Sequence, residues 1–110
     1  MKKILITGVS GFAGYKIYTS LKKSGVHDVK GTGRIPGANI DFVLDLSDLE
    51  SVKKISNHYI PDVIIHLAAM AKTEICENNK DECYSANVVS TKNLVEVFPY
   101  ARFIYFSTYA

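Results

Sequence analysis

Tryptophan is absent from the 110-residue chain, and cysteine and proline are scarce, with two and three residues. The cysteines, Cys76 and Cys83, are not a Cys-x-x-Cys pair and no histidine cluster lies near them. A disulfide framework or a zinc site is therefore not expected, and we interpret the cysteines as two free thiols in or beside a helix. We predict no metal site.

Long apolar runs are also missing. The longest apolar stretch, from Val63 to Ala71, contains His66 and is far too short to cross a bilayer. The apolar run after the first two lysines stops at Thr7-Gly8, which is too short for a secretory signal. We therefore expect a soluble, cytoplasmic protein without membrane contact.

No excess of charge of either sign is present. The formal net charge is +2, and 22% of the residues are charged. This balance argues against a strongly basic nucleic-acid surface, but it leaves room for a local site that binds an anionic small molecule. With 47% hydrophobic residues, the chain can bury one core and has the size of one domain, residues 1–110.

Short apolar runs alternate with segments of helical spacing along the whole chain. In an α/β protein this alternation implies a parallel sheet with helices on both faces, so we predict a doubly wound, Rossmann-type, three-layer fold. We expect loops over 34–39 and 68–78. The predicted strands cover 2–7, 28–32, 41–44, 62–67 and 101–107, and the predicted helices cover 12–24, 47–57 and 80–97.

Two helix signals are local. Ala13, Ile17 and Leu21 recur every four residues and predict the buried stripe of the first helix. The segment from Ser47 to Glu50 has the Ser-x-x-Glu form of a capping box and predicts the start of the second helix.

A glycine motif, Gly8-Val9-Ser10-Gly11-Phe12-Ala13-Gly14, follows the first strand and opens the first helix. Gly8 allows a sharp turn, Gly11 lets phosphate oxygens approach the backbone N–H groups, and Gly14 lets the helix pack closely. The helix N-terminus offers free N–H groups and a positive dipole end to an anion. The alternative is a tight turn that binds nothing. A P-loop is excluded because no Gly-Lys-Ser/Thr follows.

Five short motifs follow one another along the chain. They are Thr7-Gly8-x-x-Gly11-x-x-Gly14, Asp45-Leu46, His66-Leu67-Ala68-Ala69, Asn87-Val88-Val89-Ser90-Thr91 and Phe106-Ser107-Thr108. In this order they resemble the extended short-chain dehydrogenase/reductase family, and especially its nucleotide-sugar epimerases, dehydratases and dTDP-4-dehydrorhamnose reductases. The resemblance covers the whole chain. The segment from Asn87 to Thr91 departs from the family's Asn-x-x-Gly-Thr, because Ser90 replaces the glycine.

The resemblance implies a cofactor site and a substrate. Asp45 would hydrogen-bond the adenine amino group with Leu46 beside the ring, although Asp45 could instead only help to start the next helix. Asn87 would hold active-site backbone, and Thr108, with Ser107 as a weaker candidate, would hydrogen-bond the reacting substrate oxygen. The remaining predicted cofactor contacts are Gly8, Ser10, Gly11, Phe12, Ala13, Gly14, Leu67, Ala68 and Ala69. The implied substrate is a nucleotide-linked sugar.

The choice of cofactor depends on the end of the second strand, Gly31-Thr32-Gly33-Arg34. An NAD site usually has an acidic residue there for the ribose 2′-OH, whereas this segment has none and offers a guanidinium. We therefore predict NADP, with Arg34 and Ser10 near the 2′-phosphate and NAD as the alternative. Arg34 could equally be a solvated loop residue. His66, in a buried strand, is interpreted as a core histidine.

Catalysis in this family also uses a Tyr-x-x-x-Lys pair on a later helix. The one such spacing here, Tyr18 to Lys22, lies on the first helix, and we interpret it as an unrelated pair at the solvent edge. We therefore expect the chain to be a fragment, inactive alone, whose intact form carries the pair and a substrate lobe and forms a possible homodimer. The alternative is a non-catalytic, NADP-binding regulatory subunit; a flavin- or methyl-donor-binding domain fits the motifs less well.

Overall fold

The computed structural model describes residues 1–9, 11–67 and 80–105, with the side chains of 80–87 left out. The strands are β1 (Lys3–Thr7), β2 (Asp28–Gly33), β3 (Phe42–Val43), β4 (Val63–His66) and β5 (Arg102–Tyr105). The helices are α1 (Phe12–Ser24), α2 (Leu49–Ser56) and α4 (Lys80–Val97).

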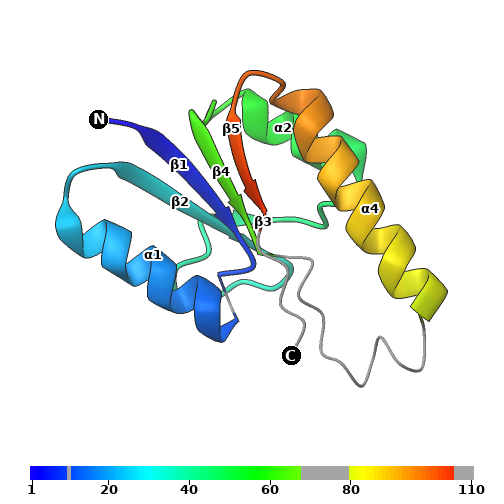
Figure 1. The fold of residues 1–110 in the computed structure, drawn as a ribbon, viewed down its shortest axis with the longest axis horizontal. Coiled ribbons are helices and arrows are strands. Elements are labelled where there is room, and N and C mark those ends of the chain that lie inside the picture. The colour runs from blue at the N-terminus through cyan, green and yellow to red at the C-terminus, as the bar shows by residue number, and fades with distance from the viewer. Residues whose placement is uncertain (10, 68–79, 106–110) are drawn as a thin grey trace.

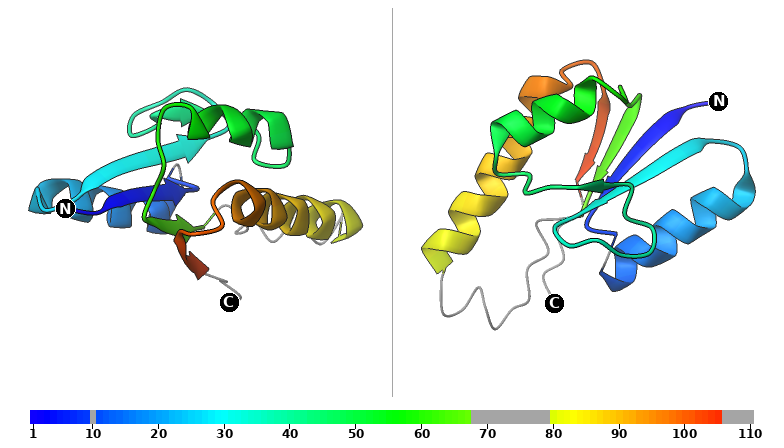
Figure 2. Two further views of the ribbon diagram at one scale, coloured as in Figure 1. Left: turned by 90° about the horizontal axis from the view of Figure 1, so that it is seen from above. Right: turned by 180° about the vertical axis from the view of Figure 1, so that it is seen from behind.

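The five strands form one parallel sheet in the order β3-β2-β1-β4-β5. Helix α1 lies on one face of this sheet, and α2 and α4 lie on the other (Figures 1 and 2). The predicted doubly wound α/β fold is therefore confirmed. Its strand order is the one expected when right-handed crossovers run outward in both directions from β1.

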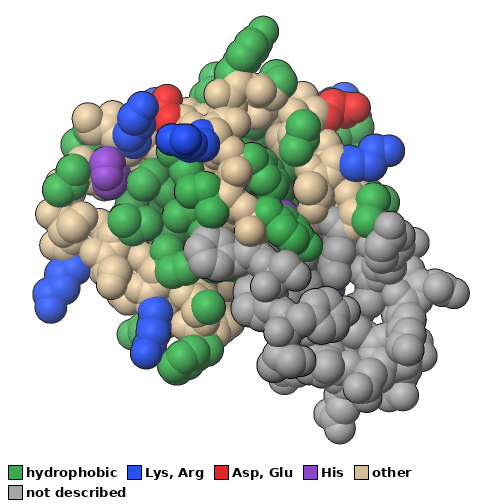
Figure 3. All heavy atoms as spheres, viewed as in Figure 1, with side chains coloured by type: hydrophobic (Ala, Val, Ile, Leu, Met, Phe, Trp, Pro, Cys, Tyr) green, Lys and Arg blue, Asp and Glu red, His purple; other side chains and the backbone are tan. Residues whose placement is uncertain are grey.

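Two apolar clusters hold the layers together, one on each face of the sheet. Alternate residues of β1 point to opposite faces, so Leu5 packs toward α2 and α4, whereas Ile4 and Ile6 pack toward α1. Figure 3 shows apolar side chains in the middle of one face of the molecule, with lysine and arginine side chains scattered around them.

The strand register brings the carboxyl ends of the central strands to one level. Thr7 of β1 pairs with Thr32 of β2 on one side and with His66 of β4 on the other. All three polar side chains are buried. The segments that follow these residues therefore begin side by side along one edge of the sheet.

Helix α1 has the predicted bounds, but its most buried residues are Gly14 and Tyr18. Ala13, Ile17 and Leu21 are only partly buried, so they flank the stripe rather than form it. The interpretation of Tyr18 as a solvent-edge residue was wrong, because Tyr18 is only 5% exposed. Gly14 packs closely and Tyr18 lies one helical turn beyond it, on the same face.

The predicted capping box at the start of α2 was also wrong. The N-cap residue is Asp48, and its side chain makes no capping hydrogen bond. Ser47 lies outside the helix, and both its N–H and its hydroxyl donate to Asp45 Oδ1, at 3.0 and 2.7 Å. The Asp45 carboxylate therefore competes successfully for the hydroxyl that the capping pattern assigned to the helix.

Candidate functional site

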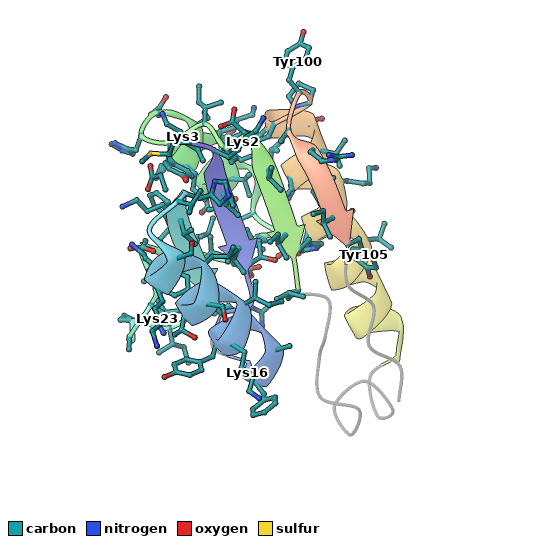
Figure 4. All side chains as sticks on the ribbon, turned by 60° about the vertical axis from the view of Figure 1, so that its left-hand side comes forward. Lys2, Lys3, Lys16, Lys23, Tyr100 and Tyr105 are labelled. Atoms are coloured by element: carbon teal, nitrogen blue, oxygen red, sulfur yellow. The ribbon has the colours of Figure 1, made fainter. Side chains whose placement is uncertain are left out.

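The strand order reverses at β1, which has β2 on one side and β4 on the other. In open parallel sheets, the crevice outside the carboxyl end of the strands at such a point is the usual ligand site. The glycine motif follows β1 at this end of the sheet. Figure 4 shows Lys16 near this end and Lys2, Lys3 and Tyr100 at the opposite end.

The glycine motif forms a tight turn between β1 and α1. Gly11 N–H donates to Gly8 O at 3.1 Å, and Gly8 has a φ of 75°, a conformation that favours glycine. A Cβ on Gly14 would lie 2.1 Å from Gly8 O, so only a glycine lets α1 approach the turn this closely. The predicted structural roles of Gly8 and Gly14 are therefore confirmed.

The turn presents backbone donors at the start of α1. The first bond of the helix runs from Tyr15 N–H to Gly11 O at 2.9 Å, so the N–H groups of Phe12, Ala13 and Gly14 precede it. No acidic residue lies in the first turn, which leaves the positive end of the helix dipole uncompensated there. Among the described residues, a Cβ on Gly11 would meet Gly8 O alone, at 3.5 Å, which is an ordinary van der Waals contact.

Two side chains flank these donors. Phe12 is 78% exposed, and the ammonium group of Lys16 lies 4.6 Å from the centre of its ring. Ala13 is partly buried. The cation–π contact keeps a positive charge within one turn of the helix N-terminus.

Arg34 and Asp45 meet at the carboxyl end of β2, although eleven positions separate them in the sequence. Arg34 Nη2 lies 3.7 Å from Asp45 Oδ1, and both side chains are largely exposed. The hydroxyl and then the N–H of Ser47 hold the pKa of Asp45 below its usual value, and the Arg34 charge acts in the same direction. Asp45 is therefore an anion that hydrogen-bonds the turn before α2 and faces Arg34.

The leucines predicted at the site have buried side chains. Leu46 is 7% exposed and packs in the cluster under α2 and α4, so its side chain belongs to the core rather than to the rim where a ring could lie. Leu67 is 3% exposed in the opposite cluster, and its N–H donates to Thr7 Oγ1 at 2.9 Å. Their predicted contacts with a cofactor remain predictions, and the backbone of both residues is the part that burial leaves best placed for them.

His66 is a core residue, as predicted, but only one of its two ring nitrogens has a hydrogen-bond partner among the described residues. Its Nδ1 lies 2.7 Å from Thr7 Oγ1, and its buried Nε2 has no hydrogen-bond partner among the described residues. The rings of Phe103 and Tyr105 flank the imidazole, each with its centre 5.7 Å away. Burial lowers the pKa of His66 to about 4, so the ring is neutral at pH 7.

Several predicted site residues lie outside the described residues: Ser10, Ala68, Ala69, Ser107 and Thr108. Cys76 and the end of the last predicted strand also fall there. The backbone of Asn87 lies in α4, on the face of the sheet opposite α1, but its side chain, like that of Cys83, is not described. The cofactor and catalytic roles of all these residues remain predictions.

Sequence reasoning missed a second contact at this edge, between Tyr18 and Asp41. The Tyr18 hydroxyl donates to Asp41 Oδ2 at 3.1 Å, and Gly31 N–H donates to the same oxygen at 2.7 Å. The four-residue spacing between Gly14 and Tyr18 was an available signal that Tyr18 is buried. Nothing in the sequence indicated Asp41 as its partner, because 23 positions separate the two.

No helix among the described residues is long and apolar enough to cross a membrane. No group of three or more histidine, cysteine, aspartate or glutamate side chains within the described part of the chain is placed to hold a metal ion.

Comparison with known proteins identifies relatives that match most of this chain. A GDP-6-deoxy-D-talose 4-dehydrogenase from Aggregatibacter actinomycetemcomitans is 34% identical over 93 residues, which are 84% of this chain and 29% of that protein. The methionine adenosyltransferase 2 subunit beta of Xenopus laevis is 33% identical over 96 residues, or 87% of this chain and 28% of that protein. The chain thus spans less than a third of either relative.

Solved structures agree with the fold. The UDP-glucose 4-epimerase of Thermotoga maritima, solved with UDP-glucose, superposes with a TM-score of 0.80 at 26% identity. The match covers 96% of this chain and 38% of that one. The family described as the RmlD substrate binding domain matches residues 1–110. With its motifs, its strand order and a match over its whole length, the chain belongs to the RmlD substrate binding domain family, and its relatives support the resemblance to short-chain dehydrogenases/reductases.

Proposed function

We propose that the chain is the nicotinamide-cofactor-binding part of an oxidoreductase, epimerase or dehydratase that acts by hydride transfer on a nucleotide-linked sugar. The observation that carries this proposal is the glycine turn, which offers the N–H groups at the start of α1 beside Gly11, where the described residues would make only an ordinary contact with an added Cβ. The names of two similar proteins, the GDP-6-deoxy-D-talose 4-dehydrogenase and the UDP-glucose 4-epimerase, support the sugar-nucleotide class.

The residues present fit a dinucleotide. The N–H groups of Phe12 and Ala13 and the helix dipole would bind the pyrophosphate, because an anion there replaces the partners that a helix N-terminus lacks. Asp45 would accept from the adenine amino group, for which its anionic state suits it. The segment from Leu67 to Ala69 would border the ribose and phosphates. The cofactor, when bound, supplies the hydride acceptor or donor.

We further propose that the cofactor is NADP. Arg34 follows β2 immediately, its side chain is 72% exposed, and its guanidinium is held near Asp45 rather than buried. A guanidinium suits a phosphate in both charge and geometry. Thr108, with Ser107 beside it, would hold the reacting oxygen of the substrate by a hydrogen bond from its hydroxyl.

A second candidate function is a non-catalytic, NADP-binding subunit. The similarity to methionine adenosyltransferase 2 subunit beta favours it, since that name describes a subunit. A Tyr-x-x-x-Lys pair that follows Ala110 in the intact protein would favour the enzyme, and an intact sequence without the pair would favour the subunit.

Calorimetric titration with NADPH and NADH tests the proposal. NADPH should bind at least about tenfold more tightly, and Arg34→Ala should remove most of that preference, because a charge-assisted phosphate contact is worth about 1.5–3 kcal/mol. Equal affinities, or tighter NADH binding, would overturn the choice of NADP.

Gly11→Ala tests the cradle in the same titration. Among the described residues the added methyl makes only an ordinary contact, with Gly8 O, but it would stand beside the N–H groups that are proposed to bind the pyrophosphate. Both affinities should fall about tenfold or more, while the free energy of unfolding falls by less than about 1 kcal/mol. Unchanged affinity for both nucleotides would contradict pyrophosphate binding at this turn.

A further inference from the structure

Tyr18 presents a buried hydroxyl to the edge of the sheet from the middle of α1. It belongs to the buried cluster that contains Ile6 of β1 and Val9 of the glycine motif. Its hydroxyl donates to Asp41 Oδ2 at 3.1 Å. Burial, followed by the charge of Asp41, raises the pKa of Tyr18 to about 12, so the hydroxyl keeps its proton and remains a donor at neutral pH.

Asp41 closes the neck of a loop formed by residues 34–40, which we call the 34–40 loop. Its Oδ2 accepts from Gly31 N–H at 2.7 Å, and its own N–H donates to Gly31 O at 2.8 Å. Leu44 N–H then donates to Gly33 O at 3.0 Å. The chain therefore leaves β2 after Gly33 and returns to the same strand at Asp41, and Arg34 is the first residue of the enclosed loop.

The 34–40 loop is packed tightly onto β2 and the glycine motif. A Cβ on Gly31 would lie 2.4 Å from Asn39 O and 2.8 Å from Val9 Cγ1, so loop, strand and glycine motif meet at this position. A Cβ on Gly33 would similarly lie 2.5 Å from Ile40 Cδ1. The loop backbone consequently has little freedom at its neck, whereas the Arg34 side chain is exposed.

We propose that Tyr18 is a positioning residue for nucleotide selection: through Asp41 it fixes the 34–40 loop relative to α1, and thereby fixes the distance between Arg34 and the glycine motif. A dinucleotide with a 2′-phosphate must reach both places at once. The helix that carries the phosphate-binding N–H groups is tied by one hydroxyl to the neck of the loop that carries the guanidinium. This inference rests on the proposed roles of Arg34 and the glycine motif.

Tyr18→Phe removes the hydroxyl and keeps the buried ring, so the core should stay packed. We expect the ratio of NADPH to NADH affinity to fall about three- to tenfold, because the loss of one hydrogen bond to a charged group loosens the loop. NADH affinity should change less than twofold. A second pair of ligands, adenosine 2′,5′-bisphosphate and adenosine 5′-monophosphate, carries no nicotinamide. The ratio of their affinities should fall by a similar factor.

Tyr15→Phe is the matched control, because Tyr15 lies on the same helix with its side chain 54% exposed. It should leave both affinities unchanged. Asp41→Ala is a second variant, which removes the oxygen that accepts from both Tyr18 and Gly31. If the hydroxyl acts through Asp41, adding Tyr18→Phe to Asp41→Ala should lower the ratio by less than twofold more, and a further loss as large as in the single Tyr18→Phe variant would contradict this route.

The failures of the two proposals are distinguishable. A wild-type protein without preference for NADPH would overturn the role of Arg34 and this inference with it. A preference that Arg34→Ala abolishes and Tyr18→Phe leaves intact would overturn this inference alone. Equal losses of NADPH and NADH affinity in Tyr18→Phe would also overturn it, since they would indicate a general structural role.

Discussion

At the residue scale, His66 is a neutral base buried in the sheet, beside Thr7 of β1 and the rings of Phe103 and Tyr105 of β5. The imidazole is 0% exposed, and one of its nitrogens has no partner among the described residues. Its pKa in the folded state, about 4, lies below the ordinary value of 6.5. The unfolded chain therefore binds this proton more readily than the folded chain between these two values.

The free energy of unfolding should depend on pH in this window. The contribution of His66 is fully present above pH 6.5 and is lost as the pH falls toward 4, by at most about 1.4 kcal/mol for each pH unit. Urea unfolding at pH 7, 6, 5 and 4.5 measures it. His66→Gln, which does not titrate, should show a clearly flatter dependence, and exposed His58→Gln should behave as the wild type.

A wild-type protein whose stability does not change between pH 6.5 and 5 would contradict the buried neutral state of His66. The same conclusion would follow if His66→Gln kept the full slope.

At the scale of secondary-structure elements, the two ends of the strands have different roles. The glycine turn and Arg34 lie at the carboxyl ends, whereas Tyr59, after α2, lies near the amino ends. The Tyr59 hydroxyl donates to Asp28 O at 2.8 Å and to Ile4 O at 3.3 Å. These hydrogen bonds link the connection between α2 and β4 to the first residues of β1 and β2.

Tyr59→Phe should separate stability from binding. Loss of the buried hydroxyl should lower the free energy of unfolding by about 1–2 kcal/mol, because two strand carbonyls lose a donor. Nucleotide affinity should stay within about twofold of wild type, since the proposed site is at the other edge of the sheet. Chemical denaturation and calorimetry measure the two quantities. Tyr100→Phe, at a 99% exposed position, is the control and should change neither.

If Tyr59→Phe weakened NADPH binding as much as Gly11→Ala does, the site could not lie only at the carboxyl edge. The measurement thus tests the location of the site independently of any residue in it.

Helices and strands were predictable because each depends on neighbouring residues. The apolar runs and Gly25 set the bounds of β1 and α1 to within a residue. The prediction of a capping box failed because two local interactions competed for one hydroxyl. Ser47 matches a helix cap, but its hydroxyl donates to Asp45 instead. The periodicity of α1 also favoured Ala13, Ile17 and Leu21, although the close approach at Gly14 rotates Tyr18 toward the sheet.

At the scale of the whole molecule, the topology was predictable because strand–helix alternation permits few arrangements. The contacts between distant segments were not predictable, because they depend on how the layers pack. Arg34 with Asp45 and Tyr18 with Asp41 join segments that no local pattern connects. The glycine motif alone indicates an anion site. The proposal of a second place, for a 2′-phosphate at Arg34, rests on these contacts between distant segments.

The proposed dinucleotide binds at the carboxyl edge of the sheet, with its pyrophosphate on the glycine turn. The most direct test follows the backbone amide signals by ¹H–¹⁵N NMR during titration with NADPH. The amides of Phe12, Ala13 and Gly14 should shift most, with Arg34 next, while Tyr59 at the opposite edge stays in place. Saturating NADPH that leaves the Phe12 to Gly14 amides unmoved, or moves mainly those near Tyr59, would contradict the account.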